Sequence, residues 1–274
     1  MANIGLPVPP GFTISCQTCM EYANADNTWP EGALDTIHEY RLDLEKRIGK
    51  KIGDAEDPLL VSVRSGAPMS MPGMMDTVLN LGLNDQSIHG LIKQTENPRF
   101  AWDSYRRFIQ MFSNVVMGLD GDLFENAITA MKNARGVASD TDLTAEDLQQ
   151  LVVEFKQIFS ENVSGVEYPS LVVDGVVAFP QDPMVQLKLA IEAVFGSWNN
   201  PRATLYRKKN KISDDWAPPS TCSAWSSATR ATPPPPALRS RATPLTARRN
   251  STATTCQRPG RRRRRRHPQH QPHR

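Results

Sequence analysis

PLLVSVRSGAPMSMPGMMDTVLNLG, residues 58–82, combines the clearest strand signal of this 274-residue chain with its most informative chemistry. The apolar run from Leu59 to Val63 predicts a buried strand. The strand leads directly into Arg64-Ser65-Gly66 and then into a loop that carries four methionines. An Arg at the end of a strand presents a rigid fork of N–H donors to a phosphate, and a nearby glycine lets backbone N–H groups approach the same anion. The stretch therefore predicts an anion-binding turn.

Two other interpretations of this stretch stay open at the level of sequence. Arg64 can instead pair with a carboxylate of its own fold. The methionines at positions 69, 71, 74 and 75 can fill gaps in a core, which is the usual role of methionine. Only the contacts in the folded chain separate a ligand site from ordinary packing.

The sequence on both sides of this stretch predicts mainly helices. A helical pattern opens at Pro30 and stops at Gly49, and residues 84–168 show apolar residues at helical spacing. The local signals are a helix start at Asn97-Pro98, a capping box from Thr144 to Asp147, a tight hairpin at Asp174-Gly175 and a second helix start at Asp182-Pro183.

The charge of the chain divides sharply between two parts. The whole sequence has 32 Lys and Arg, 29 Asp and Glu, and a formal net charge of +3. Residues 217–274 contain 13 Arg, no Lys and no acid, so residues 1–216 hold 19 basic and 29 acidic residues, a net charge of −10. Residues 217–274 also hold 10 of the 22 Pro and show no hydrophobic periodicity. Such a segment cannot bury enough apolar surface to offset chain entropy, so we expect a disordered Arg/Pro-rich tail.

Composition also excludes several classes of protein. No run of about 18 apolar residues predicts a membrane span, and no charged-then-apolar signal peptide opens the chain. The four cysteines do not suggest a disulfide framework, because the Cys16-x-x-Cys19 pair has only Cys222 and Cys256 as further partners and no His at zinc spacing. We therefore expect reduced thiols, no metal site and a cytoplasmic location.

Four segments resemble the N-terminal nucleotide-binding region of the pyruvate, phosphate dikinase family. They are GLPVPPGFTIS (5–15), PLLVSVRSGAPMSMPGMMDTVLNLGLND (58–85), RFAWDSYRRFIQMFSNVVMG (99–118) and FPQDPMVQLKLAIEAVFGSWNNPRATLYRKKNKI (179–212). The resemblance covers nearly all of residues 2–216, and the Met-Pro-Gly-Met-Met-Asp-Thr run is its most specific part. The family converts ATP, pyruvate and phosphate into AMP, phosphoenolpyruvate and diphosphate.

The resemblance implies an α+β fold with an incomplete ATP-grasp-like first lobe. That lobe is expected at residues 1–83 and 170–216, with an inserted helical subdomain at 84–169 and the disordered tail at 217–274. ATP binding is implied for Arg64, Ser65 and Gly66. A candidate nucleotide-site loop is implied for Met71, Gly73, Met74, Asp76 and Thr77.

The chain also departs from the family pattern. The family usually carries a Lys in a Gly-Gly-Lys-Gly-Ala-Asn segment before the equivalent of Met1, and its Mg²⁺ ligands beyond the equivalent of Trp216. The phosphocarrier His domain and the pyruvate-binding barrel have no counterpart here, and His38 and His89 match no carrier motif. We therefore expect ATP and Mg²⁺ as family cofactors, no catalytic residue and no metal ligand in this chain, and pyruvate and phosphate as substrates of the full-length enzyme only. The chain alone is expected to be inactive.

The genetic code suggests an origin for the tail. Ala217-Pro218-Pro219-Ser220 can be encoded by GCA CCG CCG TCA, which with one added G reads GGC ACC GCC GTC, or Gly-Thr-Ala-Val, as in the family. In that frame, residues 220–232 can hide Val-Asn-Val-Gln-Arg-Met-Val-Phe-Gly-Asn-Thr-Gly-Asp. We hypothesise one base lost at Trp216 and a second near Cys256–Gln257.

Two functions remain at this stage. The first is a dikinase fragment that contributes part of an ATP-binding site. The second is a non-catalytic protein whose basic tail, with six consecutive arginines at 261–266, binds nucleic acid or other polyanions non-specifically.

Overall fold

The computed structural model describes residues 9–66, 71–213 and 220–224. The strands are β1 (Gly11–Ile14), β2 (Lys51–Ile52), β3 (Pro58–Leu59), β4 (Val61–Ser65), β5 (Thr77–Leu81), β6 (Val172–Val173), β7 (Val176–Val177) and β8 (Ser220–Ala224). The α-helices are α1 (Cys16–Asn24), α2 (Ala33–Ile48), α3 (Ser87–Thr95), α4 (Pro98–Val115), α5 (Gly121–Arg135), α6 (Ala145–Asn162), α7 (Pro183–Gly196) and α8 (Pro201–Asn210). Short 3₁₀ turns are η2 (Asp140–Asp142), η3 (Pro169–Leu171) and η4 (Ser197–Asn199). The mixture confirms the predicted α+β class.

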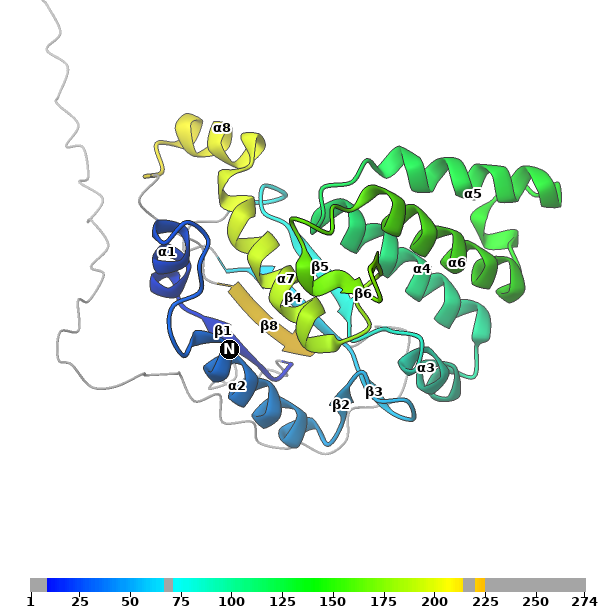
Figure 1. Ribbon diagram of the computed structural model, residues 1–274, viewed down its shortest axis with the longest axis horizontal. Helices are drawn as coiled ribbons and strands as arrows, with labels where there is room; N and C mark the ends of the chain where they lie inside the picture. Colours follow the sequence, from blue (N-terminus) through cyan, green and yellow to red (C-terminus); the bar gives the residue numbers. More distant parts are fainter. Residues whose placement is uncertain (1–8, 67–70, 214–219, 225–274) are drawn as a thin grey trace, which may run out of the picture. The chain divides into compact units, whose positions relative to one another are not determined.

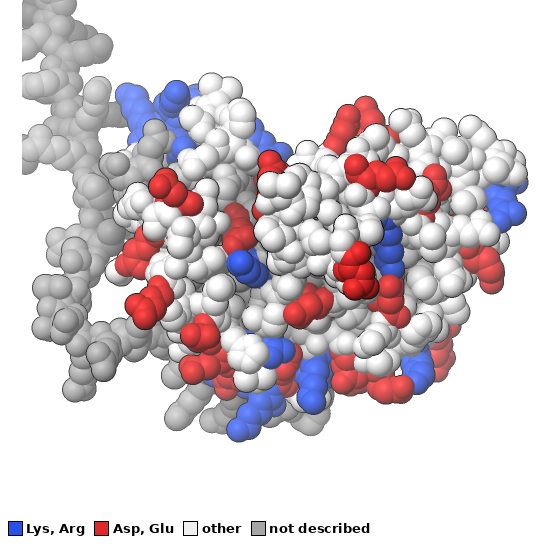
Figure 2. All heavy atoms as spheres, viewed as in Figure 1, with Lys and Arg blue, Asp and Glu red and all other residues white. Residues whose placement is uncertain are grey.

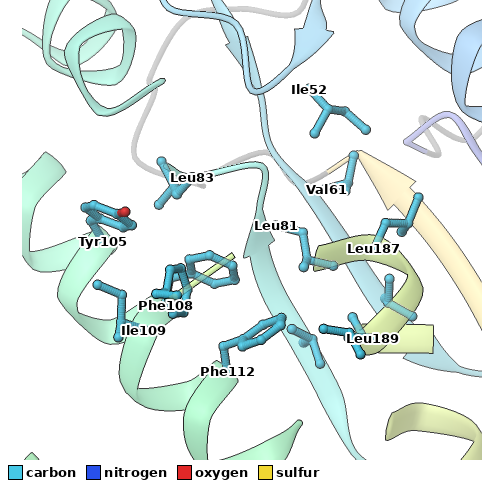
Figure 3. Close-up of a cluster of buried hydrophobic side chains, with 14 of the residues drawn as sticks. Ile52, Val61, Leu81, Leu83, Tyr105, Phe108, Ile109, Phe112, Leu187 and Leu189 are labelled. Carbon is cyan, nitrogen blue, oxygen red and sulfur yellow. The ribbon is translucent and has the colours of Figure 1, made fainter. Parts of the chain in front are cut away.

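The main sheet has four antiparallel strands in the order β1-β8-β4-β5 (Figure 1). Its two faces differ in chemistry because side chains alternate along a strand. Val61 and Val63 of β4 are fully buried, and Val63 lies opposite Val78 of β5 and Cys222 of β8. Helix α7 contacts β4, β5 and β8, and Figure 3 shows its Leu187 beside Leu81 of β5. One face of the sheet is therefore the core.

Strand β8 corrects the prediction that disorder begins at residue 217. Residues 220–224 pair with β1 on one side and β4 on the other, so their backbone groups are satisfied by both neighbours. The space is narrow: a Cβ added at Gly11 would lie 2.4 Å from the carbonyl oxygen of Cys222. The composition of residues 220–224 did not predict a strand. Their small polar side chains fit the narrow space beside β1, but such residues are also typical of disordered segments. Residues 217–219 and 225–274, the rest of the predicted tail, lie outside the described residues.

Most of the helix-end signals in the sequence are confirmed. Asn97 caps α4, Asp182 caps α7, and Thr144 with Asp147 forms the capping box of α6. Helix α2 ends at Gly49, as predicted, but it begins at Ala33 rather than at Pro30, because Gly32 adopts a left-handed conformation with φ of 73°. Among the described helices, none combines the length and the apolar character that crossing a bilayer requires.

The helices between β5 and α7 form their own layer around one aromatic ring. Phe179 receives the edges of Phe108, Phe112 and Phe159 at centroid distances of 5.3 to 5.7 Å. Figure 3 shows the Phe108 and Phe112 side chains of α4 turned toward Leu81 of the sheet. The hairpin β6–β7 forms at the predicted place, with Asp174 and Gly175 at positive φ.

The buried side-chain amide of Gln186 forms hydrogen bonds to both segments through which the chain passes between the sheet and these helices. Gln186 of α7 is fully buried, and its Oε1 accepts a hydrogen bond from Gly82 N at 3.0 Å. Its Nε2 donates to Leu83 O at 2.9 Å and to Pro180 O at 2.8 Å. Gly82 and Leu83 lead out of β5, and Pro180 leads back into α7. A single side chain thus satisfies backbone groups from both crossings.

Replacing Gln186 by Leu should therefore destabilise the fold strongly. The change keeps a similar volume but leaves one N–H and two C=O groups buried without a partner, and each such group costs about 1–3 kcal/mol. We expect the free energy of unfolding to fall by at least about 3 kcal/mol in denaturant titrations followed by circular dichroism. Gln157→Leu, at an exposed position of α6, is the matched control and should change it by less than about 0.5 kcal/mol. Equal effects of the two substitutions would contradict the role of Gln186.

Candidate functional site

The face of the main sheet opposite the core carries hydroxyl groups and one guanidinium. Arg64 lies near the end of β4, directly across from Thr77 of β5 and Thr221 of β8, so these three side chains share a face. Ser62 and Ser223 are a further pair on this face, with their hydroxyl oxygens 3.4 Å apart. On β4, strand alternation therefore sends Val61 and Val63 to the core and Ser62 and Arg64 to this side.

Arg64 is exposed, and its Nη2 donates to the hydroxyl of Ser223 at 3.1 Å. The sequence left open that Arg64 pairs with a carboxylate of its own fold. None of the ion pairs within residues 9–66, 71–213 and 220–224 involves Arg64. Strand pairing on both sides fixes its backbone, and the Ser223 contact uses only part of its fork of donors.

Ser65 and Gly66, the other two residues predicted to bind ATP, follow Arg64 directly. Ser65 is partly buried and closes β4 opposite Ser220, whereas Gly66 is exposed after the strand. Residues 67–70, with Met69 of the predicted loop, lie outside the described residues. The structure thus brings Arg64, Ser65 and Thr77 together at one end of the β4–β5 pair.

The methionines of the loop pack against the segment that contains η4 and α8. Met71 is buried together with Trp198 and Ala203, and Met74 and Met75 pack on the same cluster. The methionines therefore fill a small core, as the packing interpretation predicted. Gly73 has φ of +70°, and Met74 N donates to Met71 O at 3.1 Å, so the loop makes a tight turn in which a glycine is required.

Asp76, another predicted loop residue, faces α8. Its carboxylate accepts hydrogen bonds from Asn200 Nδ2 at 2.9 Å and from Arg202 Nη2. Sequence reasoning assigned no role to Asn200 or Arg202, although both lie inside the segment that carries the resemblance. Nothing in local spacing reveals a contact across more than 120 residues.

Basic side chains gather at the end of α8. Figure 2 shows a patch of Lys and Arg at the upper left, where Figure 1 places α8, and Lys208, Lys209 and Lys211 are exposed there. Their charge complements the carbonyl end of the helix. Arg207 is buried instead: it donates to Trp198 O and lies 4.2 Å from the centroid of the Trp198 ring.

The titratable groups that can hold a metal are dispersed. In the part of the chain that the structure describes, no three His, Cys, Asp or Glu residues lie close enough together to hold a metal ion. The described residues therefore do not fit a Mg²⁺ site, and we assign no Mg²⁺ ligand to them. His38 and His89 are both exposed on helices.

The described cysteines Cys16, Cys19 and Cys222 are free thiols. Burial raises the pKa of Cys19 and that of Cys222 to about 12, so both side chains stay protonated at neutral pH. Cys256 lies outside the described residues.

Comparison with known proteins assigns the chain to a family. Residues 29–223 match the family described as pyruvate phosphate dikinase, AMP/ATP-binding domain. The chain is 52% identical over 216 residues to pyruvate, phosphate dikinase of Clostridium symbiosum, which covers 79% of this chain and 24% of that protein. It is 50% identical over 212 residues to the Giardia intestinalis enzyme, covering 77% and 22%, and 48% identical over 216 residues to the Rhizobium meliloti enzyme, covering 79% and 23%. The chain thus spans about a quarter of the length of these relatives, and it belongs to the pyruvate, phosphate dikinase family through the AMP/ATP-binding domain.

Proposed function

We propose that this chain contributes part of an ATP-binding site in which Arg64 contacts the phosphates. The observation that carries the proposal is the exposed guanidinium of Arg64 on a rigid strand, among hydroxyls and without a carboxylate partner among the described residues. Ser65 and Gly66 follow Arg64 and add backbone N–H groups at the same strand end. Met71, Gly73, Met74, Asp76 and Thr77 form the loop that borders this site.

The chemistry of such a site is charge stabilisation. Phosphoryl transfer needs cationic donors held where negative charge develops, and a guanidinium supplies two parallel N–H groups for two phosphate oxygens. The strand pairs on both sides of β4 keep Arg64 in place before ligand arrives. Mg²⁺ is proposed only as the usual companion of ATP in the family, with ligands outside the described residues.

Dikinase activity is proposed for the longer relatives and not for this chain alone. Because the chain spans about a quarter of their length, pyruvate- and phosphate-dependent formation of AMP is not expected from it. The incomplete first lobe (1–83 and 170–216) and the helical subdomain (84–169) also stand as proposals, as does a cytoplasmic location. Some plant relatives are named as chloroplastic.

ATP titration of the full chain tests the proposed site. We expect a dissociation constant in the millimolar range, and Arg64→Ala should weaken ATP binding at least about tenfold, because it removes charge-assisted hydrogen bonds worth about 1.5–3 kcal/mol each. Arg64→Lys keeps the positive charge but loses the paired N–H donors of the guanidinium, so its dissociation constant for ATP should be intermediate. Arg47→Ala is the matched control, since Arg47 is partly exposed and pairs with Asp43 on α2.

The arginine tail complicates this measurement, because it can attract any polyanion. Tripolyphosphate at equal concentration therefore serves as a competitor, and each titration is repeated at higher salt. Unchanged ATP affinity in Arg64→Ala would overturn the proposed site. Salt-sensitive binding of random oligonucleotides, with no effect of the Arg64 variants on ATP, would favour the alternative of a polyanion-binding tail.

We also propose that residues 217–274 are read out of the ancestral frame. Ser220 and Cys222 both face the core from β8, and the buried hydroxyl of Ser220 has no hydrogen-bond partner among the described residues. The alternative frame places Val at both positions and polar Asn and Gln at 221 and 223, an alternation that suits a strand with one buried face. Resequencing the DNA that encodes residues 214–260 tests the frame directly.

Substitutions test the fit of that frame to the fold. Ser220→Val should raise the free energy of unfolding by about 1 kcal/mol or more, because it removes an unpaired buried hydroxyl and adds apolar contact. Ser223→Val is the matched control on the same strand. It removes the acceptor of the Arg64 hydrogen bond and should lower the stability. Thermal unfolding of both variants measures the difference, and a loss of stability in Ser220→Val would contradict the proposal.

A further inference from the structure

The loop at residues 71–76 packs on a hydrophobic cluster that is separate from the main core. Met71, Trp198 and Ala203 are the buried members of a second hydrophobic cluster. The partly buried members are Met74, Met75, Tyr206 and Ile212. All partners of the methionines in this cluster belong to η4, α8 or the residues just after α8. The position of the loop therefore depends on this segment.

Polar contacts join the same two segments at the point where the loop enters β5. Arg202 donates from Nε to Met74 O at 3.2 Å and from Nη2 to the Asp76 carboxylate. Asn200 Nδ2 donates to the other oxygen of Asp76 at 2.9 Å. Asp76 directly precedes Thr77, which lies opposite Arg64. These contacts therefore fix the chain next to the proposed phosphate-binding side chain.

Asn200 uses its side chain in an unusual way for its position. It occupies the N-cap of α8, where an Asn oxygen normally accepts a hydrogen bond from the first turn of the helix. No such bond forms here, and the amide donates to Asp76 instead. The first turn of α8 therefore has no side-chain cap from Asn200, and the amide group of Asn200 serves as a hydrogen-bond donor to the loop.

We propose that Arg202 and Asn200 are positioning residues for the nucleotide-binding loop and neutralise Asp76 beside the phosphates of ATP. The proposal rests on the proposed function of the Arg64 site. Asp76 directly precedes the strand position opposite Arg64 and turns its side chain toward α8, so an unpaired carboxylate there would repel a triphosphate through its field across the strand and not by direct contact. The ion pair removes that repulsion and at the same time holds the carbonyl of Met74. The two residues thus act on the charge and on the place of the loop.

This dual role separates the proposal from simple support of the fold. Arg202→Gln should weaken ATP binding about tenfold, because the negative charge of Asp76 then has no cationic partner. The affinity for adenosine, which carries no phosphate, should change less than twofold. Asp76→Asn in the Arg202→Gln background removes the charge and should restore most of the ATP affinity. A purely structural role would weaken both ligands together, and the second substitution would not rescue binding.

Titrations of the full chain by ligand-detected NMR, which reports millimolar constants, test these expectations. Arg47→Gln is the matched control for loss of one partly exposed arginine and should leave both affinities unchanged. If the unmodified chain binds ATP and Arg202→Gln binds it equally well, the positioning role is wrong while the Arg64 site stands. Parallel loss of ATP and adenosine binding, without rescue by Asp76→Asn, would also overturn it. If the unmodified chain binds no ATP, the proposed function itself fails, and the positioning role fails with it.

Discussion

The buried side chain of Gln186 is the contact on which the arrangement of the molecule depends. The chain passes from the sheet into helices α3 to α6 after β5, and it comes back from them to the sheet side just before α7. Backbone groups at both places would be buried without partners if the amide of Gln186 were absent. Asn84 and Gln181 add a second link between the same two crossings, with Asn84 Nδ2 donating to Gln181 O at 3.0 Å. The helical layer is thus tied to the sheet by directional polar contacts as well as by apolar packing.

This tie has a consequence for the candidate site. Helix α7 covers the core face of the sheet, and η4 and α8 follow directly from its end. Any shift of α7 along the sheet would carry Asn200 and Arg202 away from Asp76. The loop beside Arg64 is therefore positioned through a chain of rigid elements: the crossing contacts fix α7, and α7 carries the residues that hold the loop.

The sequence predicted those parts of the fold that rest on local chemistry. Asn97, the Thr144–Asp147 box and Asp182 mark helix starts because a cap is decided within four residues. The buried part of β4 was predicted from its apolar run, although the strand continues through Arg64 to Ser65. Arg64 itself could be singled out, because an arginine at a strand end beside a glycine has a recognisable chemistry.

Other features of the fold and of the candidate site could not be predicted from short stretches of sequence. Strand β8 has no hydrophobic pattern, and it is held by backbone pairing with strands far away in the sequence. The roles of Gln186 and Arg202 arise from contacts across more than 100 residues, which no spacing rule encodes. Met71, Met74 and Met75 show a third case, since the sequence left packing open as their role and only contacts with residues more than 120 positions away show that they pack around Trp198.

The position of β8 also sets the order in which this chain can fold during synthesis. Among the strands that the structure describes, β1 pairs only with β8 in the main sheet, and Thr13 and Thr221 are 208 residues apart. A ribosome adds about 5–20 residues per second, so β1 must wait roughly 10–40 seconds for its partner. During that interval β4 and β5 can already pair, because only a short loop separates them. Of the described strands of the main sheet, β1 is therefore made first but can join the sheet only after residue 224 has emerged, and until then its unpaired backbone groups stay accessible to chaperones and proteases.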